Sequence, residues 1–77
     1  MEFIADRITI DDKICAGKHT IRGKRITVQT ILEFLSAGES KEEILRQYPS
    51  LENDDINACL KFASELMNRN FTIKTVA

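Results

Sequence analysis

Hydrophobic residues recur with two different periods along the chain. In the first third, Ile8 and Ile10 alternate with polar neighbours, which is typical of a half-buried β-strand. Ile21 and Ile26 flank a Gly-Lys pair, which predicts a tight hairpin turn whose two isoleucines face one core. We therefore expect residues 1–27 to be extended chain that includes a short β-hairpin region.

Beyond this segment the apolar residues recur at helical spacing and predict three helices. The first begins after Thr27, a suitable N-cap, and ends near Gly38. The second opens at Ser40, and the pattern predicts a capping box in which Glu43 reaches back to the N-cap. Because proline cannot continue a helix, the second helix stops at Pro49.

The third predicted helix carries the longest apolar stripe. It begins at Asn53 or Glu52, where acidic residues favour the positive end of the helix dipole, and it ends at residues 68–70. The tail, residues 70–77, alternates again and predicts a closing strand or a partner-binding extension. The apolar stripe spans three turns and contains Ile56, Cys59, Leu60, Ala63, Leu66 and Met67.

The composition fits one small globular domain. Hydrophobic residues make up 43% of the 77 residues and charged residues 30%, both ordinary values for a folded domain. We expect a single domain over residues 1–77, with a three-helix core at 28–69. No apolar run approaches the roughly 20 residues of a membrane span, and the acidic start is unlike a signal peptide. The expectation is a cytoplasmic protein with reduced thiols and no membrane partner.

Side chains suited to catalysis or metal binding are scarce. His19 is the only histidine, and no Cys or His pair has the spacing of zinc ligands. Cys15, His19 and Cys59 can be imagined as a catalytic group. However, Cys59 lies on the apolar stripe and Cys15 in a short apolar run that predicts a strand, and both positions favour core residues. We expect no enzyme activity, metal, cofactor or small-molecule substrate.

Three helices with short connections are compatible with a helix-turn-helix, in which the second and third helices form the bihelical unit. The non-apolar face of the third helix offers Asn53, Asn57 and Lys61. Asparagine can read adenine in the major groove, and lysine can meet guanine or phosphate. Three acids within residues 52–55 would oppose a phosphate lattice. A plain solvated helix terminus is an equally good interpretation of that end.

Charge is distributed unevenly although the net charge is only −1. Residues 13–25 hold five basic residues and no acid, whereas residues 33–55 hold seven acids and two basic residues. Arg22, Lys24 and Arg25 lie at the predicted turn, where long side chains could straddle a phosphate backbone. Alternatively, this basic segment pairs with the acidic helices of the same chain. The sequence leaves both interpretations open.

The run GKHTIRGKRITV at residues 17–28 resembles the signature of the domain-of-unknown-function 433 family, approximately G-K-P-x-I-R-G-T-R-I-P-V. The chain departs from that pattern at His19, Lys24 and Thr27, and also at Glu52, where threonine is usual. The resemblance covers roughly residues 7–65. It continues through the blocks Ala37-Gly38-Glu39-Ser40, Glu42-Glu43-Ile44-Leu45, Tyr48-Pro49-Ser50-Leu51 and Asp54-Asp55-Ile56.

The resemblance implies a mainly α fold, a three-helix homeodomain-like or winged-helix-like bundle with a short N-terminal β-hairpin region. Many such proteins are regarded as antitoxins of the VapB type, encoded beside a toxin with a PIN-like ribonuclease fold. The implied function is a non-enzymatic, antitoxin-like DNA-binding regulator that represses its own operon and neutralises that toxin. The alternative is a homodimeric protein-interaction module without DNA binding, in which exposed strand edges pair across a two-fold axis.

Overall fold

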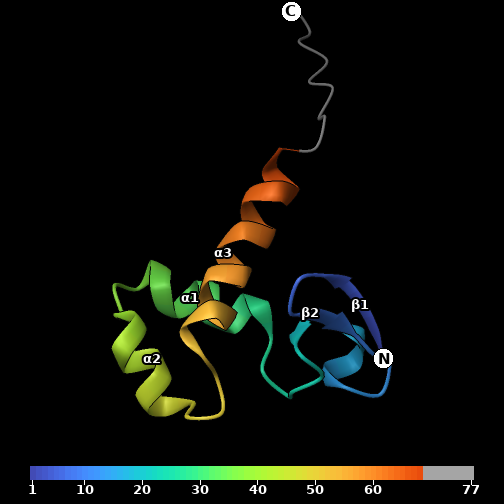
Figure 1. The fold of residues 1–77 in the computed structure, drawn as a ribbon, viewed down its shortest axis with the longest axis horizontal. Coiled ribbons are helices and arrows are strands. Elements are labelled where there is room, and N and C mark those ends of the chain that lie inside the picture. Colours follow the sequence, from blue (N-terminus) through green and yellow to red (C-terminus); the bar gives the residue numbers. More distant parts are fainter. Residues whose placement is uncertain (69–77) are drawn as a thin grey trace, which may run out of the picture.

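The computed structural model describes residues 1–68, which form three helices and a three-stranded antiparallel sheet. In Figure 1 the sheet lies on one side of the molecule and α2 on the other, with α1 and α3 between them. The predicted tail at 70–77 lies outside the described residues. In chain order the elements are β1 (Glu2–Ala5), β2 (Ile8–Ile10), the short 3₁₀ turn η1 (Cys15–Gly17), β3 (Thr20–Ile21), α1 (Val28–Ser36), α2 (Lys41–Gln47) and α3 (Asn53–Met67).

The sheet has the strand order β1-β2-β3. The loop after β3 is wider than the predicted tight turn, because Thr20 bridges to Thr27 and six residues lie between them. Ile21 N–H donates to the Ile26 carbonyl at 3.1 Å within this loop. Ile21 is fully buried and Ile26 packs against the same core, so the prediction that the two share a core is confirmed.

The prediction of a strand at Cys15 is wrong. Cys15 and Ala16 have φ values of 50° and 55°, and Gly17 follows at 78°. A β-strand needs a strongly negative φ, so three successive positive values end the extended chain. The segment closes instead as a turn in which Gly17 N–H donates to the Ile14 carbonyl at 3.1 Å.

The predicted ends of α1 are confirmed. The Thr27 hydroxyl accepts a hydrogen bond from Thr30 N–H at 3.1 Å. At the other end Gly38 has a φ of 92°, and Glu39 N–H donates to the Phe34 carbonyl at 3.0 Å. This left-handed glycine lets the chain fold back over the last turn and satisfy a free carbonyl, as in a Schellman motif.

The start of α2 is confirmed only in part. The Ser40 hydroxyl accepts from Glu43 N–H at 3.1 Å, as an N-cap should. The Glu43 carboxylate does not complete the capping box but accepts two hydrogen bonds from Arg46, at 2.6 and 2.7 Å. Helix α2 therefore has one cap bond and a surface ion pair one turn further on.

The core lies where α1 and α3 meet β2 and α2. Helix α3 buries Ile56 and Cys59 completely, as predicted, but Leu60 and Met67 are 42% and 76% exposed. Helix α3 packs against both α1 and β2. The face that these neighbours cover therefore includes Phe62, which is buried, and leaves out Leu60 and Met67. The buried apolar side chains are Ile8, Ile21, Val28, Ile31, Ile44, Leu51, Ile56, Ala58, Cys59 and Phe62.

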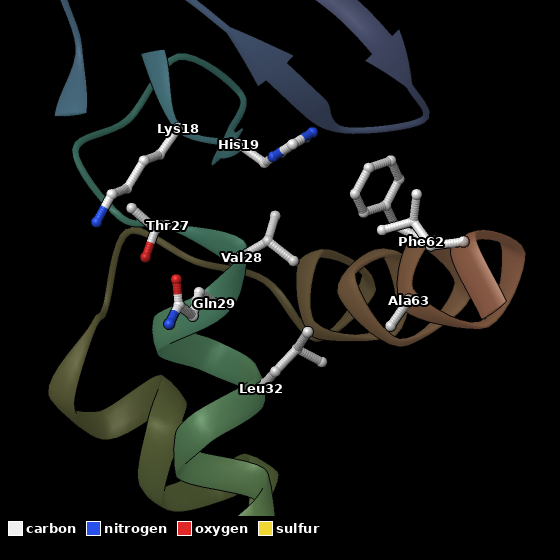
Figure 2. Close-up of a pocket in the computed structure, with 9 residues that line it drawn as sticks. Lys18, His19, Thr27, Val28, Gln29, Leu32, Phe62 and Ala63 are labelled. Atoms are coloured by element: carbon white, nitrogen blue, oxygen red, sulfur yellow. The ribbon is translucent and has the colours of Figure 1, made fainter. Parts of the chain in front are cut away.

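A pocket of about 260 Å³ opens between α1 and α3 beside His19 (Figure 2). The imidazole of His19 packs against the ring of Phe62 in a tilted arrangement, with 5.1 Å between the ring centroids and 44° between the ring planes. Within residues 1–68, no group of three or more His, Cys, Asp or Glu side chains is placed to hold a metal ion. Among the described helices, none combines the length and the apolar character needed to cross a membrane.

Candidate nucleic-acid interface

Helices α2 and α3 are joined by the five residues 48–52 and both pack against α1. The connection is fixed from inside, because Leu51 is buried and its N–H donates to the Tyr48 carbonyl at 3.0 Å. Tyr48 N–H in turn donates to the Ile44 carbonyl at 2.9 Å. The unit is thus a short helix and a long helix joined by an anchored connection, at the positions where the sequence predicts two helices.

The outward face of α3 carries the three predicted base-reading residues. Asn53, Asn57 and Lys61 are spaced four residues apart and all three are exposed. Because residues four apart lie on the same face of a helix, these side chains form one polar row. Lys41 at the start of α2 donates its Nζ to Asn57 Oδ1 at 2.6 Å, which links α2 to this row.

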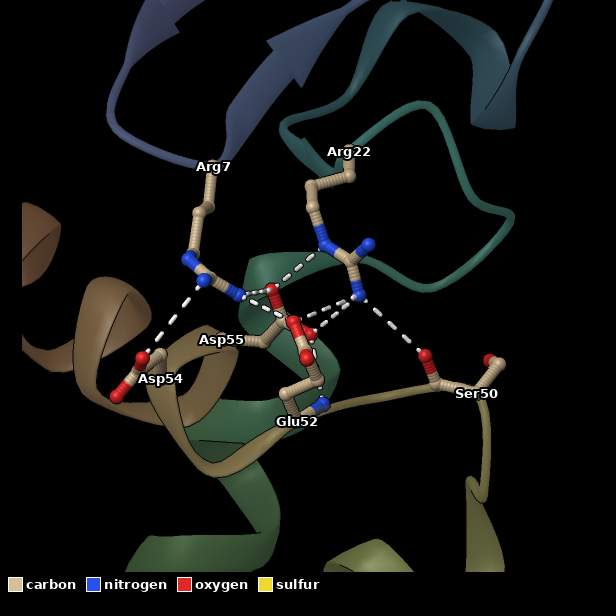
Figure 3. A network of polar contacts seen from close by, with 6 residues as sticks. All are labelled: Arg7, Arg22, Ser50, Glu52, Asp54 and Asp55. Atoms are coloured by element: carbon tan, nitrogen blue, oxygen red, sulfur yellow. Dashed lines mark hydrogen bonds and ion pairs between the residues drawn. The ribbon is translucent and has the colours of Figure 1, made fainter.

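The acidic end of α3 is organised around one buried carboxylate. Asp55 is 0% exposed, and its two oxygens accept four hydrogen bonds. Arg22 donates Nε to Oδ1 at 2.8 Å and Nη2 to Oδ2 at 2.7 Å, and Arg7 donates Nη1 to Oδ1 at 3.0 Å. The fourth donor is Glu52 N–H, 2.7 Å from Oδ2, so Asp55 also caps its own helix (Figure 3). These four bonds match the roughly four lone-pair sites of a carboxylate.

The hydrogen bonds decide the charge of Asp55. Burial alone raises the pKa of this carboxyl, but the bonds from Arg22, the Glu52 backbone and Arg7 outweigh it and lower the pKa to about 2. Hydrogen bonds to the side chains of Glu52 and Asp55 raise the pKa of the Arg7 guanidinium, and those to Asp55 raise the pKa of the Arg22 guanidinium. Asp55 is therefore an anion held between two cations at any physiological pH.

The two arginines reach Asp55 from separate parts of the sheet (Figure 3). Arg7 lies in the turn between β1 and β2, and Arg22 lies in the loop after β3. Their φ values of 64° and 45° are left-handed, a conformation that costs a residue other than glycine about 1–2 kcal/mol. The contacts of both side chains with Asp55 offset that cost and join the sheet to the first turn of α3.

The basic residues of the loop after β3 differ in whether they form ion pairs with acids of the same chain. Arg22 forms an ion pair with Asp55, and its Nη2 also donates to the Ser50 carbonyl in the α2–α3 connection at 3.4 Å. Lys24 and Arg25, two and three residues further on, take part in no ion pair among residues 1–68. Arg22 anchors the start of this loop to α3, and Lys24 and Arg25 follow it along the chain.

Arg7 is the member of the site that sequence reasoning did not find. Its Nη1 lies 2.8 Å from Glu52 Oε1, and its Nη2 lies 3.7 Å from Asp54 Oδ2. Arg7 therefore contacts the same acidic side chains whose negative charge would repel a phosphate backbone. No local motif marks this residue, because its partners lie 45 to 48 positions away along the chain.

Acid is expected to remove the contribution of Asp55 to stability. The pKa of Asp55 falls from 3.8 to about 2 on folding, so this contribution is present above the unfolded pKa and disappears as the pH falls through about 2. The difference corresponds to about 2 kcal/mol. Urea unfolding of the parent chain and Asp55→Asn across this pH range should show the gap between them shrinking. A gap that is the same at neutral and acid pH would contradict the assignment.

The two thiols are expected to differ in reactivity. Cys59 is fully buried, and burial raises the pKa of its thiol to about 12. Because the thiolate is the reactive form, this side chain should be inert in the folded protein. With dithiobis-nitrobenzoate at about pH 8, the half-buried Cys15 should react first, and Cys59 only after denaturant is added. Two equally fast thiols in the native protein would contradict the burial of Cys59.

Comparison with known proteins places these features in a family. The family model described as "Protein of unknown function (DUF433)" matches residues 8–63. The crystal structure of a DUF433 member protein from Anabaena variabilis ATCC 29413 is similar, with a TM-score of 0.72 and 30% sequence identity. That match covers 77% of this chain, and the chain spans only 58% of that protein's length. Among curated proteins, none matches this sequence.

The matched residues run from the start of β2 into the second half of α3, and they include Arg22, Asp55 and the polar row of α3. A fold similar over 77% of this chain thus recurs in a crystal structure with 30% sequence identity. The chain belongs to the DUF433 family, proteins of unknown function.

Proposed function

We propose that this chain is a non-enzymatic DNA-binding regulator of the helix-turn-helix type that acts in the cytoplasm. The observation that carries the proposal is the exposed row Asn53, Asn57 and Lys61 on α3, next to an anchored α2–α3 turn. In this proposal α3 enters the major groove and the row meets base edges. A sheet beside a three-helix unit supports a comparison with homeodomain-like and winged-helix-like domains.

The electrostatics of the α3 terminus are compatible with a phosphate backbone. Three acids, Glu52, Asp54 and Asp55, face two cations, Arg7 and Arg22, so the cluster sums to 2 − 3 = −1. The strong repulsion that the sequence alone suggests is thus largely cancelled inside the protein. Lys24 and Arg25 then add two positive charges in the adjacent loop, and these are the phosphate contacts that we propose.

The proposal is tested with duplex fragments that tile the region upstream of the gene, in an electrophoretic mobility assay. One fragment should be retained more tightly than a scrambled duplex. The double variant Asn57→Ala/Lys61→Ala should lose about tenfold or more on that fragment and much less on the scrambled duplex, while Ser64→Ala serves as a control on the same helix. Equal retention of all fragments, or of none, would contradict base reading by α3.

The antitoxin part of the proposal rests on the family resemblance. In it the chain represses its own operon and neutralises a PIN-like ribonuclease toxin encoded beside it. A tagged copy purified from its own cells should retain a small nuclease-like protein. Repeated recovery of the tagged chain alone would contradict this role and leave the DNA-binding proposal in place.

Self-association is proposed from the edge of the sheet. Strand β1 lies at the edge of the sheet order β1-β2-β3, and it exposes Phe3 by 59% and Ile4 by 41%. An exposed strand edge can pair with a second copy across a two-fold axis. Sedimentation should show a dimer that dissociates in Phe3→Ser/Ile4→Ser, and a monomer at every concentration would contradict it. A dimer that binds no DNA would favour the interaction-module alternative.

A further inference from the structure

We propose that the pocket between α1 and α3 is a docking site for a partner-protein segment that presents a large apolar side chain next to a carboxylate. Val28 and Leu32 of α1 face Phe62 and Ala63 of α3 across this pocket, and together they give it an apolar floor (Figure 2). Lys18 stands at its rim. The pocket thus has an apolar interior and a cationic edge. An apolar side chain of the occupant would fill the interior, and a neighbouring carboxylate would pair with the edge.

The size of the pocket favours a side chain over a metabolite. Its volume is about 260 Å³, whereas pockets for small-molecule ligands measure about 300–1,000 Å³. A volume of this order holds one or two side chains. Protein interfaces obtain most of their affinity from such anchors, which fill a pocket while the surrounding contacts exclude water.

The charge around the pocket favours an acidic occupant. Within residues 1–68 no Asp or Glu side chain lines it, and the first turn of α1, whose N-terminal end forms one wall, contains no acidic residue. The positive end of the α1 dipole and Lys18 therefore lie at the same edge, and no Asp or Glu in the described part of the chain forms an ion pair with Lys18. The chain's own residues 69–77 contain two basic side chains, Arg69 and Lys74, and no Asp or Glu, so they offer this edge no acidic side chain.

The pocket lies on the opposite side of α3 from the polar row. Phe62 follows Asn53 by nine residues, and Leu66, which also lines the pocket, follows Asn57 by nine. Nine residues are about two and a half helical turns, so each pair lies on opposite faces. A protein segment in the pocket and DNA on the polar row can be bound at the same time. The inference therefore does not depend on DNA binding.

The test is a titration of the full ¹⁵N-labelled chain with blocked tetrapeptides, followed by amide chemical shifts. The central pairs of the peptides are Leu-Asp, Leu-Lys and Ala-Asp. The Leu-Asp peptide should give saturable shifts at Val28, Gln29 and Ala63, and it should bind more tightly than the other two. Equal binding of the three peptides, or shifts that lie elsewhere, would overturn the proposal.

Two pairs of matched variants define the two features of the site. Lys18→Glu should reverse the order of the Leu-Asp and Leu-Lys peptides, whereas Lys13→Glu, in the same basic segment, should not. Ala63→Trp should fill the pocket and abolish the shifts, whereas Ser64→Trp should leave them. Unchanged binding in both Lys18→Glu and Ala63→Trp would overturn the proposal.

Two other occupants would also overturn it, and each has its own signature. If the chain's own tail fills the pocket, Phe71→Ser/Ile73→Ser in the full chain will shift the pocket amides without any peptide. If a second copy fills it, those amides will shift with protein concentration alone. Amides that respond to neither change, and then respond to the Leu-Asp peptide, support the proposal.

Discussion

Asp55→Asn is expected to lower the free energy of unfolding by about 3 kcal/mol. Removing one member of a buried ion network strands its partners, and here Arg7 and Arg22 lose the carboxylate that both of them contact. Their side chains are 27% and 32% exposed, so water offsets part of the loss and the lower end of the usual range applies. For a domain of this size the melting temperature should fall by roughly 12–24 °C.

Asp54→Asn is the matched control for this substitution. Asp54 also lies in the first turn of α3, but its side chain is 74% exposed and its contact with Arg7 is 3.7 Å. It should cost less than about 0.5 kcal/mol, and the loss of a helix-dipole interaction is common to both variants. Urea unfolding of the two variants measures the difference. Values within about 0.5 kcal/mol of one another would mean that the network does not join the sheet to α3.

Lys24→Ala/Arg25→Ala is expected to weaken DNA binding by about 10- to 100-fold at low salt without a loss of stability. Each lost phosphate contact should also reduce the salt dependence, by about 0.9 in the slope of log affinity against log salt. Thermal unfolding should be unchanged, because neither side chain forms an ion pair within the described part of the chain. Fluorescence anisotropy across a salt series measures both affinity and slope.

Lys13→Ala/Lys18→Ala removes two charges from the same basic segment and should leave the slope closer to that of the parent chain. Arg22→Ala does not substitute for either double variant, because loss of its bonds to Asp55 would destabilise the fold. An unchanged slope in Lys24→Ala/Arg25→Ala would remove this loop from the interface.

Local signals in the sequence predict the elements of this fold well. Thr27, Ser40 and Gly38 mark helix ends through their own short-range hydrogen bonds or φ values, and the structure confirms each of them. The alternation at Ile8 and the helical spacing at Ile56 likewise find residues that are fully buried. In each case the physical cause lies within a few residues, so the pattern is visible in the sequence.

Features that depend on distant partners are not visible in this way. The contact between Arg7 and Asp55 joins positions 48 apart, and the left-handed φ of Arg7 has no signature in an arginine. Leu60 fits the apolar spacing of α3 but is 42% exposed, because the neighbours of α3 decide which arc is covered. The split within the basic segment, with Arg22 bound to Asp55 and Lys24 outside any described ion pair, needs the same three-dimensional information.

The most direct test of the proposed function is the fluorescence anisotropy of a labelled duplex from upstream of the gene. It should be measured with the full chain at about 50 and about 200 mM salt, beside a scrambled duplex. A DNA-binding regulator predicts tight binding that weakens steeply with salt and exceeds binding to the scrambled duplex at both concentrations. No binding at the lower salt concentration would contradict it, and would mean that the acidic residues at the start of α3 still repel phosphate despite Arg7 and Arg22.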